Sequence, residues 1–151
     1  MLIAVSFTLS GFAQKPDFSG TWKLNESKSK LGAEFSMAPG TLIISQDRNT
    51  LTSESIADFQ GQEFRQKNTY KLDGSESKNE GWQGMELVSI ANWIEDGKSV
   101  EIKTTVEMMD GGELTITQTF GMDGENLVVE NALAGGPMGG GDPERWVYDK
   151  D

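Results

Sequence analysis

Apolar and polar residues alternate along most of the chain, and the alternation is clearest between Ser99 and Met109. One face of this stretch is Val100, Ile102, Thr104, Val106 and Met108, and the other is Glu101, Lys103, Thr105 and Glu107. A repeat of two residues is typical of a β-strand that turns one face to the core and the other to water. The stretch Phe18 to Asn25, FSGTWKLN, has the same pattern.

This repeat predicts β-strands over most of the sequence, while no segment shows a sustained helical period. The segment 26–32, ESKSKLG, forms at most one short turn of helix. We expect strands at residues 18–25, 41–47, 50–57, 62–72, 85–95, 98–108, 113–121, 125–133 and 144–149, with a weaker one at 75–80.

Asp-Gly pairs separate several of these strands, at Asp73-Gly74, Asp96-Gly97, Asp110-Gly111 and Asp123-Gly124. They supply the positive φ angles of tight hairpin turns, so consecutive strands should be antiparallel neighbours. A series of short hairpins favours an up-and-down meander, and closure on itself removes the unpaired edges. The prediction is a single antiparallel β-barrel of about 8 to 10 strands, with a Greek-key sandwich as the alternative.

Composition narrows the chemistry. With 151 residues the chain suits one domain, and it contains neither cysteine nor histidine. Disulfides, thiolate catalysis and the commonest general base and metal ligand are therefore excluded, and we expect no metal and no cofactor. The net charge of −11 argues against a nucleic-acid partner, which would require a basic surface.

The first residues, MLIAVSFTLSGFAQ, are uncharged and end in small residues that suit cleavage after Ala13. We interpret residues 1–13 as a signal peptide without its basic start and residues 14–151 as the barrel domain. The alternative is a buried N-terminal strand. The run is too short for a membrane span. A secreted or periplasmic location is therefore expected.

The two ends of the chain resemble a known family. FSGTWKLN followed by ESKSKLG resembles the N-terminus of the calycin superfamily, in which Gly-x-Trp on the first strand, here Gly20 and Trp22, begins a closed lipid-binding barrel. The closest likeness is to fatty-acid-binding proteins and to small secreted bacterial lipocalin-like proteins. The terminal WVYDKD is similar to the last strand of fatty-acid-binding proteins.

The resemblance implies features that this chain alters. The segment 25–40 is too short and too rich in Gly, Pro and Ser for the helix-turn-helix lid of fatty-acid-binding proteins. In fatty-acid-binding proteins an Arg-x-Tyr pair on the last strand binds the ligand carboxylate. In this chain the spacing of Arg145 and Tyr148 is three, which places them on opposite faces of a regular strand. In lipocalins a late arginine packs over the first-strand tryptophan, which implies that Arg145 covers Trp22 in a structural, cation–π role.

Several polar side chains share the predicted inward faces. Gln66, Asn68 and Tyr70 alternate with charged residues that must face water, and Gln118 lies between Ile116 and Phe120. Asn131 follows Val129 in the same way. Buried amides need partners, so they either bond one another and trapped water or face a cavity. The predicted ligand-binding residues are Gln66, Asn68, Tyr70, Trp93, Gln118 and Phe120.

These observations predict a monomer that binds a small hydrophobic or amphipathic, lipid-like molecule without catalysis. No inward face carries two suitably placed carboxylates, and serine has no base here. The alternative is an extracellular interaction or structural module with a filled core. Such a module would recognise its partner through Trp82 and the glycine-rich loop at residues 134–141.

Overall fold

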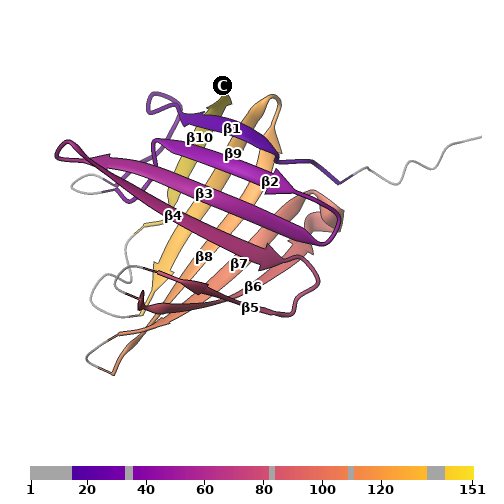
Figure 1. Ribbon diagram of the computed structural model, residues 1–151. Helices are drawn as coiled ribbons and strands as arrows, with labels where there is room; N and C mark the ends of the chain where they lie inside the picture. The colour runs from indigo at the N-terminus through magenta and orange to yellow at the C-terminus, as the bar shows by residue number, and fades with distance from the viewer. Residues whose placement is uncertain (1–14, 33–35, 82–83, 109–110, 136–141) are drawn as a thin grey trace, which may run out of the picture.

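The computed structural model describes residues 15–32, 36–81, 84–108, 111–135 and 142–151, and the barrel side chains other than that of Phe59. These residues form one antiparallel sheet of ten strands (Figure 1). The strands are β1 (Gly20–Leu24), β2 (Thr41–Gln46), β3 (Thr50–Phe59), β4 (Gln62–Lys71), β5 (Glu76–Glu80), β6 (Glu86–Ile94), β7 (Ser99–Glu107), β8 (Glu113–Asp123), β9 (Asn126–Ala134) and β10 (Glu144–Lys150). A short 3-10 helix, η2 (Glu95–Gly97), connects β6 to β7.

The sheet closes almost completely into an up-and-down barrel. Its spatial order is β4-β3-β2-β1-β10-β9-β8-β7-β6-β5, so each strand pairs with its sequence neighbours, except that β4 and β5 do not pair. The first and last strands, β1 and β10, pair with each other, and β4 and β5 form the two edges of the sheet (Figure 1). The predicted all-β fold and antiparallel meander are confirmed.

The predicted strand boundaries agree with the structure within a few residues, and the weak strand at 75–80 is β5. The first strand begins at Gly20 and not at Phe18. The Phe18 N–H donates to Gln46 Oε1 at 2.9 Å, and so bonds a side chain of β2 in place of its backbone.

The hairpin turns follow the glycine pattern. Gly74, Gly97 and Gly124 have φ angles of 82°, 82° and 61°, in the region that glycine enters without steric cost. Asp96 also lies there, with φ of 57°. The turns at Gly97 and Gly124 thus join paired antiparallel strands, as the sequence predicts. The predicted hairpin at Asp73-Gly74 is wrong, because β4 and β5 on either side of it do not pair and form the two edges of the sheet.

The core occupies the closed part of the barrel and consists of the inward residues of the alternating pattern. Trp22, Leu51, Ile102 and Leu127 are almost completely buried. Phe18 closes one end, where its ring lies 6.2 Å from that of Trp93 and 6.4 Å from that of Phe120. Burial of each large apolar side chain stabilises the fold by roughly 1.5–3 kcal/mol.

The connection from β1 to β2 contains no pair of packed helices in its described residues. Lys28 and Ser29 close a turn onto Asn25 and Glu26, and Lys30 then pairs with Arg145 of β10. The segment therefore continues the edge of β10 where β1 ends. No helix in the described part of the chain is long and apolar enough to cross a membrane.

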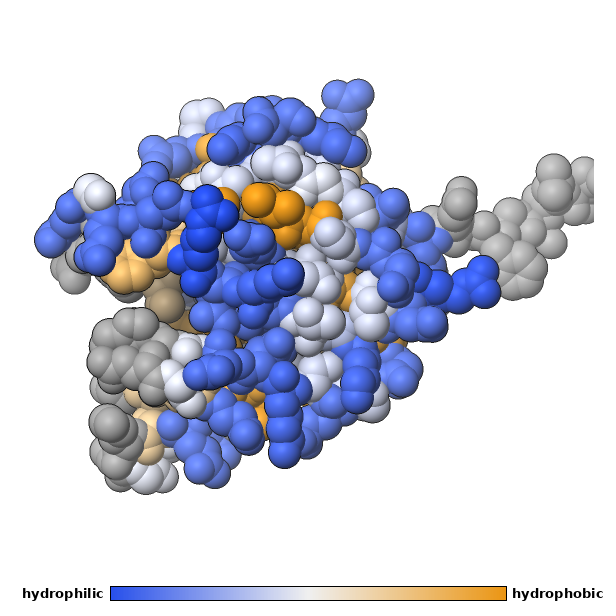
Figure 2. Space-filling model, viewed as in Figure 1, coloured by the Kyte–Doolittle hydropathy of each residue, from blue (hydrophilic) through white to orange (hydrophobic). Residues whose placement is uncertain are grey.

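The outer surface carries the charge. Figure 2 shows hydrophilic residues over most of the face formed by β1 to β5, with a small hydrophobic cluster near its centre. The outward positions of β4 include Lys67, Thr69 and Lys71, all exposed. Placing the charges outward leaves the inner face of the same strand to amides and aromatic residues.

Candidate functional site

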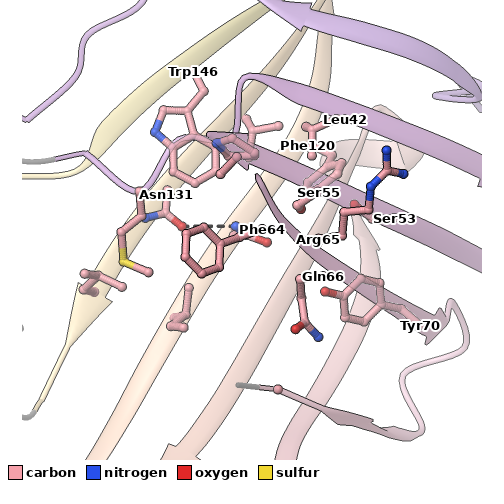
Figure 3. A pocket seen from close by; sticks show the side chains of 18 residues that line it. Leu42, Ser53, Ser55, Phe64, Arg65, Gln66, Tyr70, Phe120, Asn131 and Trp146 are labelled. Carbon is pink, nitrogen blue, oxygen red and sulfur yellow. Dashed lines mark hydrogen bonds between the residues drawn. The ribbon is translucent and has the colours of Figure 1, made fainter. Parts of the chain in front are cut away.

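A cavity of about 510 Å³ lies inside the barrel. Its described lining is mostly apolar, with a few neutral polar groups and one charged residue (Figure 3). The lining comprises Met37, Pro39, Leu42, Ser53, Ser55, Ala57, Phe64, Arg65, Gln66, Tyr70, Gly81, Ile116, Gln118, Phe120, Val129, Asn131, Leu133 and Trp146. Pockets of roughly 300–1,000 Å³ with such a lining are typical of small-molecule sites.

The cavity has a closed end and an accessible end. Phe120 belongs to its floor. The Phe18 ring meets that of Phe120 edge-on and stacks on Trp93. At the other end Met37 and Phe64 line the cavity although their exposed fractions are 55% and 44%. Exposed apolar side chains at a cavity entrance favour an apolar occupant.

Gln118 and Asn131 form an amide pair on one wall. They are directly opposite in the β8–β9 register, both face inward, and Gln118 Nε2 donates to Asn131 Oδ1 at 3.2 Å. One bond leaves further N–H groups and an amide oxygen of the pair without a protein partner among the described residues. No side-chain polar atom that is sealed from solvent lacks a partner in this part of the chain. The remaining amide atoms are therefore open to the cavity.

Gln66 lies on the opposite wall, as Figure 3 shows for Gln66 and Tyr70 against Asn131 and Trp146. Its Nε2 donates to Asn68 Oδ1 at 2.7 Å and to the Glu80 carbonyl at 2.8 Å. Both N–H groups of this amide are occupied, and its carbonyl oxygen remains as an acceptor.

Hydroxyl groups add neutral polarity to the Gln66 wall. Ser53 and Ser55 of β3 lie opposite Asn68 and Gln66 in the β3–β4 register. Burial raises the pKa of Tyr70 to about 12, against which a hydrogen bond with Asn68 acts weakly. The Tyr70 phenol is therefore uncharged at neutral pH.

The one charged residue among those described in the lining is already paired. Arg65 donates to Glu54 Oε1 at 2.9 Å and to Glu63 Oε1 at 2.6 Å, and its side chain is 57% exposed. These two hydrogen bonds raise the pKa of Arg65. The residue contributes its stem to the rim, while its charge is held by two carboxylates on the outer face.

The predicted site residues fall into two groups. Gln66, Tyr70, Gln118 and Phe120 line the cavity, and Asn68 lies behind Gln66 and accepts its hydrogen bond. Whether each of them binds a ligand stays a prediction.

Trp93 does not line the cavity, which corrects its assignment to the site. It packs under the floor against Phe18, with Lys15 Nζ 5.1 Å from its ring centre. It is inward-facing, but it lies at the filled end of the barrel.

The prediction that Arg145 covers Trp22 is wrong. Lys150, which is opposite Trp22 in the β1–β10 register, places its Nζ 5.5 Å from that ring, while Arg145 faces Asp123 on the outer surface at 3.4 Å. Gly20, with φ of 138°, makes room, because a Cβ there would lie 3.1 Å from the Lys150 stem. Trp22 Nε1 donates to the Phe18 carbonyl at 2.9 Å.

Arg145 and Tyr148 lie on opposite faces of β10, as their spacing predicts. Arg145 is exposed, whereas Tyr148 is buried and donates its hydroxyl to the Pro39 carbonyl at 2.9 Å. Desolvation, with Glu144 nearby, raises the pKa of Tyr148. No Arg–Tyr pair therefore faces the cavity from this strand.

Sequence reasoning missed Ser53, Ser55, Phe64 and Trp146 as lining residues. The strand LTSESIADF has polar residues on both faces, so its inward side cannot be identified without a partner strand. Its register with β4 supplies that information, since Gln66 and Asn68 were recognisable as inward.

Side chains close the barrel between β4 and β5. Asn79 of β5 accepts from the Thr69 N–H at 2.9 Å and donates to the Thr69 carbonyl at 3.0 Å. The Lys71 N–H donates to Ser77 Oγ at 2.8 Å. The amide of Asn79 thus takes the place of a backbone peptide next to the cavity.

Two solved structures share this fold. An abundant heat soluble (SAHS) protein from Ramazzottius varieornatus is 11% identical, with a TM-score of 0.59. Apo lipid binding protein 8 from Caenorhabditis elegans is 13% identical, also with a TM-score of 0.59. Each match covers 89% of this chain and 95% of the other. No protein-family model matches the sequence, and no curated protein matches it. At these identities the likeness shows the fold alone.

Proposed function

We propose that this protein binds one small lipid-like molecule inside the barrel and performs no reaction on it. The observation that carries the proposal is the cavity of about 510 Å³, which is apolar in most of its lining and carries neutral amides on two walls. The described lining includes no carboxylate and no imidazole that could act as a general base.

The fold supports this proposal. The C. elegans neighbour is by name a lipid binding protein, and it has the same barrel architecture. Since fold and function are separable, the support lies in the agreement between the architecture and the cavity of this chain.

The size of the cavity also bears on the alternative, an interaction module with a filled core. A filled core would leave room for only a few waters. The cavity volume of about 510 Å³ is many times the roughly 30 Å³ that one water occupies in the liquid. Trp82 and residues 136–141, through which that module would act, lie outside the described residues. The interior therefore favours ligand binding.

A neutral dye such as Nile red tests the proposal. We expect saturable, one-to-one binding to the folded protein and displacement by single-chain lipids. Ile116→Trp should abolish dye binding because it fills the cavity. The matched control is Thr117→Trp on the next, outward-facing position of β8, which should leave dye binding unchanged. If the dye does not bind, or binds both variants equally, the proposal fails.

We further propose that the protein is exported and acts as a monomer. The support for export is the uncharged start of the sequence with Ala13 before a charged segment, and the monomeric state is a prediction that the same measurement tests. Native mass spectrometry of protein from its own source would show a chain that begins near Gln14, its oligomeric state and any retained ligand by mass. A chain that retains residues 1–13 in the cytoplasm would contradict export.

A further inference from the structure

The described lining of the cavity contains no free positive charge. Among the described lining residues only Arg65 is cationic, and its guanidinium is bound by Glu54 and Glu63. The lysines of β4, Lys67 and Lys71, are exposed on the outer face. A carboxylate placed at the amide wall would find no cation with which to pair.

A negative charge lies beside the amide wall, because Glu144 is opposite Asn131 in the β9–β10 register. Glu144 Oε2 accepts from Trp146 Nε1 at 3.0 Å and from Ser36 Oγ, and the Trp146 ring lines the cavity. This carboxylate also contributes to the raised pKa of Tyr148. With a net charge of −11, the protein as a whole adds repulsion for an anion.

The polar groups that do face the cavity are neutral and offer both donors and acceptors. The Gln118–Asn131 pair retains N–H groups and an amide oxygen, and the Gln66 side-chain carbonyl accepts no hydrogen bond from the described residues, although both of its N–H groups are used. Such groups satisfy a hydroxyl, an ester or an amide without a desolvated charge. Burial of an unpaired carboxylate costs far more than burial of a hydrogen-bonded neutral group.

We infer that this barrel selects neutral amphipathic lipids over fatty-acid anions, with the uncharged polar end of the ligand held by Gln118 and Asn131. The inference rests on the proposed lipid-binding function and names its ligand class. The cavity volume of about 510 Å³ is in the range of sites for one small ligand, so the ligand class that we name is a single-chain lipid.

Three ligands of equal chain length test the inference: oleyl alcohol, methyl oleate and oleate. Each competes with Nile red at about pH 8, where the fatty acid is ionised. We expect oleyl alcohol and methyl oleate to displace the dye at concentrations at least about tenfold lower than oleate. Equal or tighter binding of oleate would overturn the inference and leave the proposed function standing. Failure of all three ligands, or of the dye itself, would instead contradict the proposed function.

Two substitutions at one position locate the head group. Gln118→Leu should lower the affinity for oleyl alcohol by about tenfold and leave the affinity for an alkene of the same length unchanged, because only the alcohol bonds the amide. Gln118→Lys should reverse the ranking in favour of oleate, because it supplies the missing cation. Circular dichroism and dye stoichiometry establish that each variant folds. The order of affinities in the unaltered protein is measured without any variant. If both variants fold and keep that order of affinities, the head group lies elsewhere and the assignment to Gln118 is overturned.

Discussion

The barrel is closed at two seams that differ in kind. At the β1–β10 seam, Trp22, Lys23 and Leu24 pair with β10, and the Asp151 N–H bonds the Thr21 carbonyl at 2.9 Å. At the β4–β5 seam no backbone pairing is present in the described residues, and Asn79, Ser77 and Gln66 provide the bonds from their side chains (Figure 1). One seam depends on the peptide backbone, and the other depends on which residues occupy β4 and β5.

Because of this difference, we expect one seam to affect mainly the stability of the barrel and the other to affect access to the cavity. A backbone ladder persists through most single substitutions, whereas a seam held by side chains is removed by changing one or two residues. The side-chain seam also borders the cavity, because Gln66 both lines the cavity and bonds the Glu80 carbonyl. Substitutions at the two seams should therefore have separate consequences.

The largest effect is expected at the β1–β10 seam. Trp22→Ala should lower the free energy of unfolding by about 3–5 kcal/mol, since it empties a site that is 2% exposed and removes the bond to the Phe18 carbonyl. Urea denaturation measures the change. Trp22→Phe is the control, and it should recover most of the loss. An effect below that of a surface substitution would show that the seam does not depend on its tryptophan.

The next effect is a dependence of the folding stability on pH, which one tyrosine beside each seam should report. Burial raises the pKa of Tyr70, on β4, to about 12, and also raises that of Tyr148, on β10. Folding thus favours the neutral phenol. The resulting contribution to the free energy of unfolding is complete below about pH 10 and is lost as the pH rises through about 12. For Tyr70 this loss amounts to roughly 2–3 kcal/mol.

Absorbance of ionised tyrosine measures this titration. In the folded protein Tyr70 should titrate first, near pH 12, and Tyr70→Phe should remove that step. Urea-unfolded protein is the control, in which both residues titrate near pH 10. Ionisation of either tyrosine near pH 10 in the folded barrel would show that its seam is open to water.

A smaller loss of stability is expected from the β4–β5 seam. Asn79→Ala removes both bonds to the Thr69 backbone, which should cost about 1–2 kcal/mol. Hydrogen exchange should accelerate at the Thr69 amide but not at amides of the β1–β10 seam. The control is Lys78→Ala, an exposed neighbour. If exchange at Thr69 is unchanged, backbone pairing and not Asn79 holds β4 to β5.

The smallest effect concerns the cation above Trp22. Lys150→Met keeps the aliphatic stem but removes the charge 5.5 Å from the ring centre, so it should cost about 0.5–1 kcal/mol. Thermal unfolding measures the loss, and Lys150→Arg should restore it. Since Arg145 lies on the outer face, Arg145→Met should have no comparable effect.

The sequence was sufficient for the strands, the turns and much of the inward face. Alternation and Asp-Gly turns are local signals, and the charged outward residues of β4 identify Gln66 and Tyr70 as inward. The meander then follows, because consecutive strands joined by hairpins pair with each other, although the rule fails between β4 and β5.

The remaining features depend on the register and contacts between strands, which the pattern along a single strand does not encode. Lys150 covers Trp22 because of the β1–β10 register, and Trp93 leaves the site because Phe18 fills that end of the barrel. Ser53 and Ser55 could be placed only once β3 was aligned with β4. The closure by Asn79 likewise arises between two strands that do not pair.

The sheet order has a consequence for the folding pathway. The strands β1 to β4 and β5 to β10 are two runs of hairpins whose contacts are short in sequence, so each can form early. Joining Trp22 to Lys150 requires closure of a loop that includes nearly the whole described chain, which carries the largest entropic cost. The seam with the most backbone bonds should therefore form last, and a circular permutant opened at Asp73–Ser75 would convert that slow step into one more local hairpin.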